Sequence, residues 1–261
     1  MLRIKGLSKT FYPGTPEENI VFQNFSLDIE DHTCTAILGP NGCGKSTLFQ
    51  MISGSLVQDD GSIELDDFLL TDLPEEKRAK YIGKVSQDPS MGVSPSLSIL
   101  ENMSIAMKKG EPFSFKKLLK KQDLNFIVAK LKELNLGLED KLNTEVKFLS
   151  GGQRQSLSLL MATLRTPRIL LLDEHTAALD PKTSRLIMEK TKDFIQRDGL
   201  TTLMITHNLK NAIDYGDRII MLNEGQIALD VDANSIREDE LLKLYNEQVE
   251  QSLRSEFLQA V

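Results

Sequence analysis

The sequence is poor in cysteine and contains no long hydrophobic run. Its two cysteines, Cys34 and Cys43, fall on a predicted strand and in a glycine-rich loop, so they form no disulfide framework and favour a reducing compartment. No apolar stretch approaches the roughly 18 residues that span a bilayer, and residues 1–6 lack the apolar core of a signal peptide. These absences predict a cytoplasmic protein that reaches a membrane only through another protein.

The chain also lacks an excess of positive charge. Its formal net charge is -7 and its pI is about 5.2. Proteins that bind nucleic acid usually carry a basic surface, so we expect no nucleic-acid partner. With 261 residues, 40% of them hydrophobic, the chain can bury a large core in one or two domains.

One glycine-rich stretch, residues 39–47, matches the pattern Gly-x-x-x-x-Gly-Lys-[Ser/Thr]. It follows a predicted buried strand over 33–38 and precedes a predicted helix over 47–52. Glycines let successive N–H groups turn inward, and the start of the helix adds partial positive charge. We therefore interpret it as a cradle for a nucleoside triphosphate, rather than a glycine-rich turn with an exposed lysine. Its residues are Gly39, Pro40, Asn41, Gly42, Cys43, Gly44, Lys45, Ser46 and Thr47.

Individual side chains near this loop have expected roles. Lys45 would reach the β- and γ-phosphates, Ser46 would bind Mg²⁺, and Thr47 would donate to the α/β region. Cys43 is either a thiol whose alkylation blocks activity or an inert buried thiol. Phe11 is our candidate for stacking on the purine ring, although a plain core aromatic is a close alternative.

Strand-like and helix-like segments alternate through most of the chain. This alternation predicts an α/β fold with a mostly parallel sheet wrapped by helices. Residues 90–150 instead have a sequence pattern typical of helices. There, Ser98 and Glu101 form a capping-box signature for a helix ending near Met107. A lysine group there is either a basic docking patch or, as we prefer, a solvated helical face. The group comprises Lys108, Lys109, Lys116, Lys117, Lys120 and Lys121.

Two carboxylates, Asp173 and Glu174, directly follow a fully apolar predicted strand over 169–172. The carboxyl edge of a parallel sheet is where acidic residues meet a phosphate site. Asp173 would hold Mg²⁺ through water, and Glu174 would orient and polarise the attacking water. An acidic pair of this kind is often only a turn feature, but the phosphate loop upstream favours catalysis.

A second anion nest is predicted at residues 149–153, Leu-Ser-Gly-Gly-Gln, which precede an apolar helix-like run over 156–163. The alternative is a capped helix start behind a flexible turn. Because the chain already cradles phosphates elsewhere, a second nest suggests that it contacts the γ-phosphate bound by a partner chain.

In their order, these motifs resemble those of the nucleotide-binding subunit of an ATP-binding cassette (ABC) transporter. The resemblance covers about residues 2–230. It implies that 39–47 is the Walker A loop, Gln87 the Q-loop glutamine, 149–153 the signature, Asp173 and Glu174 the Walker B pair, 177–180 the D-loop and His207 the switch histidine.

The resemblance also implies a domain organisation. We expect a P-loop NTPase core with a mostly parallel sheet, an antiparallel β subdomain and a helical subdomain. The core with the N-terminal β subdomain would comprise 1–89 and 151–230. The helical subdomain would comprise 90–150, and 231–261 would form a helical tail.

By the same resemblance, two cassettes pair head to tail, as a homodimer or with a related cassette. The signature residues Ser150, Gly151, Gly152 and Gln153 of one chain would close over ATP on the Walker A loop of the other. Asp180 would lie near the dimer seam. The catalytic set would be Glu174, His207, Gln87 and Lys45, with Ser46, Gln87 and Asp173 around Mg²⁺.

Three function classes compete. The first, which we prefer, is an ATPase at the inner face of the cell membrane that drives solute import through permease subunits, served by an extracellular solute-binding protein. The second is a soluble ABC ATPase acting on ribosomes or nucleic acid, and the third is a non-hydrolysing cassette, which intact Lys45, Glu174 and His207 disfavour. His175 stands where the family often has proline or a small residue. It is either a tolerated turn substitution or a sign of similarity to amino-acid importers.

Overall fold

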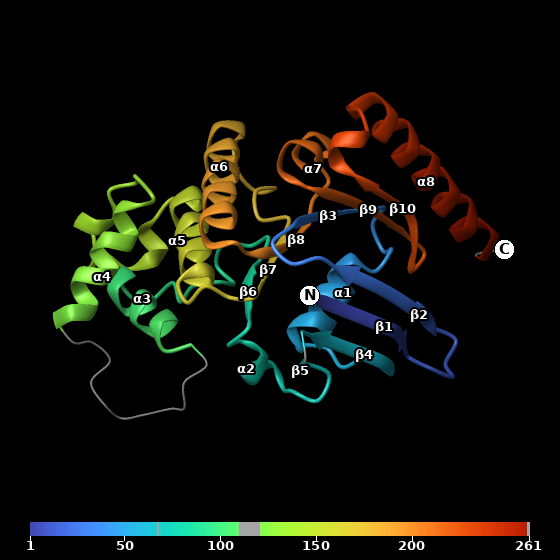
Figure 1. Cartoon of the computed structure of the whole chain (residues 1–261), viewed down its shortest axis with the longest axis horizontal. Coiled ribbons are helices and arrows are strands. Elements are labelled where there is room, and N and C mark those ends of the chain that lie inside the picture. The colour runs from blue at the N-terminus through green and yellow to red at the C-terminus, as the bar shows by residue number, and fades with distance from the viewer. Residues whose placement is uncertain (67, 110–120, 260–261) are drawn as a thin grey trace. The chain divides into compact units, whose positions relative to one another are not determined.

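The computed structural model describes residues 1–66, 68–109 and 121–259. The chain divides into two compact units (Figure 1). The first unit contains Met1–Arg78 and Thr201–Val261, and the second contains Ala79–Leu200. The predicted lysines Lys116, Lys117 and Lys120 lie outside the described residues.

The first unit contains a four-stranded antiparallel sheet in the order β2-β1-β4-β5. Its strands are β1 (Leu2–Phe11), β2 (Asn19–Ile29), β4 (Asp60–Leu65) and β5 (Phe68–Leu69). Leu2 pairs with Ile29 on one side and Leu65 on the other, and all three are buried. One face of this sheet is therefore core, as the alternating pattern of β1 predicts.

The same unit contains a second sheet, in which the order is β10-β9-β3-β8. Its strands are β3 (Cys34–Leu38), β8 (Thr201–Ile205), β9 (Arg218–Asn223) and β10 (Gln226–Asp232). β3 is parallel to both β8 and β9, and every residue of β3 and β8 is buried. Such strands need mostly apolar residues on both faces, which explains why residues 36–38 of β3 and 203–205 of β8 are all hydrophobic. The predicted mostly parallel sheet and the antiparallel β subdomain are thus confirmed.

The described residues of this unit form α1 (Lys45–Ser53), α2 (Glu75–Arg78), α7 (Leu209–Tyr215) and α8 (Glu238–Gln259), with a 3₁₀ turn at Ala233–Ser235. α8 contacts α7 and β9 (Figure 1). Leu241 of α8 is fully buried, and Asn223 Nδ2 at the end of β9 donates to Gln248 Oε1 at 2.9 Å. The helix-prone tail predicted from the sequence therefore packs on the sheet along one side of α8.

The second unit pairs β6 (Ile82–Val85) with β7 (Ile169–Asp173) in parallel. Its helices are α3 (Ile99–Met107), α4 (Lys121–Lys132), α5 (Gly151–Thr163) and α6 (Pro181–Asp198), with 3₁₀ turns at Leu138–Asp140 and Val146–Phe148. The capping box predicted for α3 is present, because Ser98 Oγ accepts from Glu101 N at 3.2 Å and Ser98 N donates to Glu101 Oε2 at 2.8 Å. α5 packs against α3, α6 and β6.

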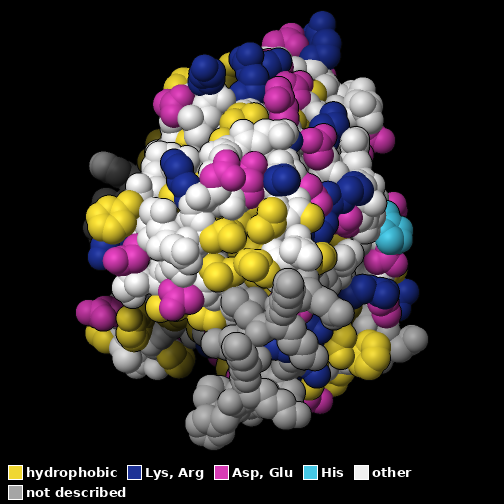
Figure 2. Space-filling model, turned by 90° about the vertical axis from the view of Figure 1, so that its left-hand side faces the viewer, with side chains coloured by type: hydrophobic (Ala, Val, Ile, Leu, Met, Phe, Trp, Pro, Cys, Tyr) yellow, Lys and Arg dark blue, Asp and Glu magenta, His cyan; other side chains and the backbone are white. Residues whose placement is uncertain are grey.

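The charged side chains of the helical unit are mixed in sign. Figure 2 shows Lys and Arg interspersed with Asp and Glu around a central group of hydrophobic side chains. Of the described lysines in the predicted patch, Lys109 Nζ donates to the Ile82 carbonyl at 3.1 Å. Lys109 thus ties the end of α3 to β6. Among the described helices, we find no segment with the length and hydrophobicity of a membrane span.

Candidate nucleotide site

The phosphate loop between β3 and α1 depends on glycine at specific positions. Gly39 and Gly44 have φ values of 146° and 104°, in the region that favours glycine. A Cβ atom at Gly39 would lie 2.2 Å from the Leu222 carbonyl oxygen, and one at Gly44 would lie 2.7 Å from Phe22 Cζ. The loop therefore fits against β9 and β2 only with bare backbone at these positions.

The first turn of α1 carries Lys45, Ser46 and Thr47. Its N-cap residue, Gly44, supplies no side-chain cap, so no side chain satisfies these first N–H groups at the cap. Such N–H groups, at the positive end of the helix dipole, are suited to bind phosphate oxygens. The Lys45 ammonium is buried and donates to the Gly39 and Pro40 carbonyls at 2.8 and 2.7 Å. These bonds hold the lysine against the loop.

The other end of α1 is anchored by Arg78, which the sequence analysis did not single out. Arg78 Nη1 donates to the Met51 and Ile52 carbonyls at 2.7 and 3.1 Å, and Nε donates to the Leu73 carbonyl at 2.7 Å. The side chain is only 3% exposed, and burial lowers its pKa. A cation at a helix C-terminus complements the helix dipole, so Arg78 stabilises the helix that presents Lys45 and Ser46.

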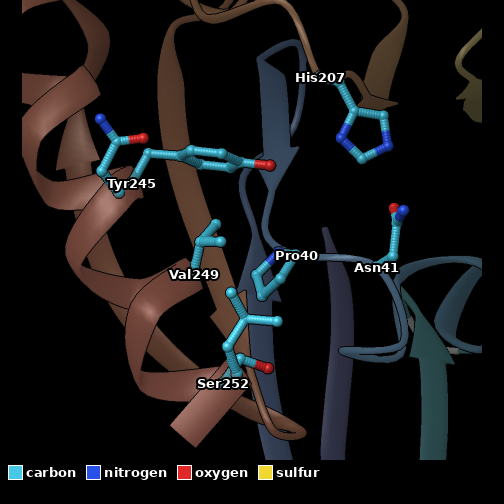
Figure 3. A pocket seen from close by; sticks show the side chains of 8 residues that line it. Pro40, Asn41, His207, Tyr245, Val249 and Ser252 are labelled. Atoms are coloured by element: carbon cyan, nitrogen blue, oxygen red, sulfur yellow. The ribbon is translucent and has the colours of Figure 1, made fainter.

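His207 follows β8 and lines a cavity of about 500 Å³ beside the phosphate loop. Figure 3 shows the Asn41 amide and the His207 imidazole facing one another, with the Tyr245 ring entering from α8. The structure thus brings three predicted site residues, Pro40, Asn41 and His207, to one cavity. The residues that line it are Pro40, Asn41, His207, Tyr245, Asn246, Val249, Ser252 and Leu253.

Phe11, the predicted stacking residue, ends β1 and is half-exposed. Lys9 Nζ lies 5.6 Å from the centroid of its ring, within the range of a cation–π contact. The neighbouring Tyr12 has a φ of 52° and is 64% exposed. Phe11 therefore presents a half-exposed ring at the end of β1, whose pairing with β2 has register shifts, and its stacking role stays a prediction.

The second unit holds the acidic pair and the Q-loop glutamine at one edge of its strands. Val85 of β6 pairs with Leu172 of β7, so the residues that follow both strands emerge at the same end. Asp173 ends β7 and Glu174 follows it, both half-buried, whereas Gln87 is exposed. The parallel register explains how positions distant in sequence converge.

The signature residues begin α5. Ser150 is the N-cap residue, and its Oγ accepts from Gln153 N at 3.2 Å while Ser150 N donates to Gln153 Oε1 at 3.1 Å. The capped-helix interpretation is therefore confirmed. Capping does not prevent anion binding, because the Ser150 hydroxyl, which accepts this bond, still has a proton to donate to an anion.

Asp180 is the N-cap residue of α6, and Pro181 lies in the first turn. Its Oδ1 accepts from Thr183 N at 3.1 Å, and hydrogen bonding by the Thr183 side chain, followed by that from its backbone N–H, lowers the pKa of Asp180. The exposed carboxylate thus stays ionised at neutral pH. Its position at a dimer seam remains a prediction.

His175 is buried, at 2% exposure, and its Nε2 lies 3.1 Å from Thr191 Oγ1 on α6. Burial lowers its pKa to about 4, so the imidazole is neutral near pH 7. The residue is therefore a packed and hydrogen-bonded part of the turn after β7. The sequence interpretation as a tolerated turn substitution did not include this partner.

Both cysteines are buried. Burial raises the pKa of Cys34 to about 12 and also raises the pKa of Cys43, against the opposing influence of Lys45. A thiol with a raised pKa has little reactive thiolate at neutral pH. Of the two interpretations of Cys43, the structure favours the inert thiol.

A glycine loop joining a buried parallel strand to an uncapped helix start, in a chain with an acidic strand end, defines a P-loop nucleotide-binding protein. The chain belongs to the ABC transporter family, whose pattern matches residues 22–177. It is similar to a tyrosine transport ATP-binding protein from Clostridioides difficile, with 49% identity over 231 residues, 88% of this chain and 92% of that protein. The family and the α/β cassette fold predicted from the sequence are thus confirmed.

Two further comparisons agree. A spermidine/putrescine import ATP-binding protein from Haemophilus influenzae is 33% identical over 221 residues, 85% of this chain but only 56% of that longer protein. The dimeric post-hydrolysis structure of the ATP-binding cassette MJ0796 bound to ADP and Pi has a TM-score of 0.76 and 29% identity, covering 89% of this chain and 99% of that one. The chain is accordingly an ATP-hydrolysing subunit of an ABC transporter.

Proposed function

We propose that this subunit powers the import of an amino acid of the aromatic class. The proposal is carried by the 49% identity with the tyrosine transport protein, which extends over 88% of this chain. Other relatives, for spermidine/putrescine and for aliphatic sulfonates, are named as import proteins at 33% and 34% identity. The stronger similarity favours an amino acid over a polyamine or a sulfonate.

Transport in proteoliposomes tests this proposal. The subunit would be reconstituted with the membrane protein that co-purifies with it and with the solute-binding protein of the same system. We expect ATP-dependent accumulation of labelled tyrosine, but not of spermidine or an alkanesulfonate, on the side opposite the subunit. Export of tyrosine, or accumulation of another solute alone, contradicts the proposal. Recovery with ribosomes and no membrane protein supports the alternative class.

We propose a role in ATP binding or hydrolysis for residues within each unit. In the first, Lys45 and Thr47 contact the phosphates through the start of α1, Phe11 stacks on adenine, and His207 contacts the γ-phosphate. In the second, Glu174 orients and deprotonates the attacking water. His207 already shares a cavity with the loop residue Asn41, which supports its proximity to the nucleotide.

Mg²⁺ fits the proposed donors. Ser46, Gln87 and Asp173 offer hydroxyl, amide and carboxylate oxygens, which are the hard ligands that Mg²⁺ prefers. Asp173 ends β7 and Gln87 comes two residues after β6, and these strands pair in register, so both residues lie at the same edge of the second unit. When bound, the ion neutralises charge on the phosphate oxygens. Gln87 would thereby link the bound nucleotide to the helical block over 90–150.

The change Glu174→Gln tests the catalytic assignment. We expect steady-state hydrolysis to fall by about 10²-fold or more, with ATP binding retained, because the amide cannot accept the proton. Glu189→Gln, on an exposed position of α6, is the matched control. Unchanged hydrolysis in Glu174→Gln removes Glu174 from this role.

Two copies, or this chain and a related cassette, are proposed to sandwich ATP head to tail. Ser150, Gly151, Gly152 and Gln153 of one chain would face the phosphate loop of the other, with Asp180 at the seam. The dimeric state of MJ0796 and the donor proton of Ser150 support this arrangement. Light scattering of Glu174→Gln with Mg-ATP should show a dimer that Ser150→Ala weakens. If Glu174→Gln stays monomeric with Mg-ATP, the proposed dimer is contradicted.

The permease would bind the helical block, which places the subunit at the inner face of the cell membrane. Exposed apolar side chains in this unit support a protein partner, because large apolar groups are seldom left in water without one. Met91 and Phe148 are 75% and 70% exposed, and Ile105 is 48% exposed. Loss of co-purification after Phe148→Asp, with ATP binding intact, would support this surface.

A further inference from the structure

The turn that carries Glu174 is packed onto α6 through its next residue. His175 lies 2% exposed between β7 and α6 in sequence, and its Nε2 is 3.1 Å from Thr191 Oγ1. Thr191 is itself 1% exposed. Both polar groups are therefore withdrawn from water, and the hydrogen bond between them supplies a partner for Nε2 of the buried imidazole.

The direction of this hydrogen bond follows from the second bond of Thr191. Its Oγ1 donates to the Ile187 carbonyl at 2.8 Å, and a hydroxyl has only one proton. Toward His175, Thr191 must therefore accept. The imidazole accordingly carries its proton on Nε2, and helix α6 fixes both its tautomer and its orientation.

The backbone of Glu174 needs such support. Its φ is 45°, in the left-handed region that residues other than glycine enter infrequently. A conformation of this kind persists where surrounding structure holds it in place. On the preceding side, β7 is held by its pairing with β6. After Glu174, the turn is closed by its carbonyl, which accepts from Ala177 N at 2.9 Å. On the following side, the buried anchor is His175.

We infer that His175 is a positioning residue for hydrolysis, whose Nε2–H bond to Thr191 holds the backbone of Glu174 so that its carboxylate meets the attacking water. This inference rests on the proposed role of Glu174. His175 does not touch the nucleotide in this scheme. It acts by setting the direction of the Glu174 carboxylate. Hydrolysis is sensitive to that direction, because the carboxylate must be oriented toward the attacking water.

Three threonine variants test the inference. Thr191→Val keeps the shape but leaves the His175 N–H without an acceptor, whereas Thr191→Ser keeps the hydroxyl. Thr163→Val is the matched control, because Thr163 is also buried on a helix of this unit and its hydroxyl donates to the Leu159 carbonyl at 2.9 Å. We expect kcat to fall about 10- to 100-fold in Thr191→Val, with the KM for ATP within about twofold. Thr191→Ser and Thr163→Val should retain wild-type kcat.

Two outcomes overturn the inference. One is wild-type kcat in folded Thr191→Val, and the other is an equal loss in Thr163→Val, which would indicate general helix damage. If Thr191→Val does not fold, the ¹⁵N spectrum of His175 in the wild-type protein decides, because a proton on Nδ1 contradicts the assigned bond. If Glu174→Gln hydrolyses ATP normally, the proposed role of Glu174 is wrong. If Glu174→Gln is inactive but Thr191→Val has normal activity, only the role of His175 is wrong.

Discussion

Gly152 of the signature lies directly against Thr183 in the first turn of α6. A Cβ atom at Gly152 would come within 2.3 Å of Thr183 Cγ2, far closer than two carbon atoms approach. The neighbouring Gly151 differs, because its Cβ would meet Leu179 Cδ2 at an ordinary 3.5 Å. The second glycine therefore lets the starts of α5 and α6 pack closely, apart from any role in binding phosphate.

The change Gly152→Ala should lower the free energy of unfolding by about 1–3 kcal/mol, because the added methyl group overpacks this contact. Gly151→Ala should have little effect. Thr183→Ser removes the clashing methyl, so the double variant should recover most of the stability. Urea denaturation measures the free energy of unfolding of the wild type, Gly152→Ala, Gly151→Ala and the double variant Gly152→Ala with Thr183→Ser. Equal destabilisation by the two alanine changes would falsify this account.

Arg78→Met should destabilise the protein by at least about 1–3 kcal/mol, because carbonyl groups at the end of α1 lose a buried donor. Arg237→Met is the control, since Arg237 is 80% exposed in its pair with Asp239. It should change stability by less than about 0.5 kcal/mol. Chemical denaturation measures both variants, and similar midpoints would contradict the anchoring role of Arg78.

Lys45→Ala should weaken ATP binding about 10- to 100-fold, since a hydrogen bond to a charged group contributes about 1.5–3 kcal/mol. Calorimetry with ATP measures the change. Lys210→Ala, on an exposed position of α7 with its ammonium 3.3 Å from Asp214, should bind ATP normally. Wild-type affinity in Lys45→Ala would remove the lysine from the phosphate site.

Cys34 and Cys43 should resist iodoacetamide in the native protein at pH 7 to 8. Both pKa values are raised by burial, so the thiolate fraction at a given pH is smaller than for an ordinary cysteine and grows only as pH rises further. In denaturant both should react rapidly. Mass spectrometry of labelled peptides checks this, and fast native labelling of Cys43 would restore the reactive interpretation.

Local patterns in the sequence predicted much of the fold. The apolar run before Gly39 predicted buried β3, and the Ser98 and Glu101 pair marked the start of α3 to the residue. The caps at Ser150 and Asp180 were also predictable, because capping depends on residues three positions apart. These features need no knowledge of distant contacts.

Features that depend on packing between distant segments were not predictable in this way. The partner of His175 lies 16 positions later on a helix, and nothing in the intervening spacing identifies Thr191. Nothing in the local sequence distinguishes Arg78 from other arginines, because its acceptors, the Met51 and Ile52 carbonyls, lie far from it in the chain. The close approach of Thr183 to Gly152 likewise follows from how two helices meet, which pairwise periodicity does not specify.

The cavity beside His207 is a suitable place for a fluorescent probe. The chain contains no tryptophan, and Tyr245 of α8 lines that cavity together with Asn41 of the phosphate loop (Figure 3). An indole introduced by Tyr245→Trp would be the sole tryptophan fluorophore of the molecule. Its emission would follow the surroundings of His207, the predicted switch histidine, in real time, without any dye attached to the chain.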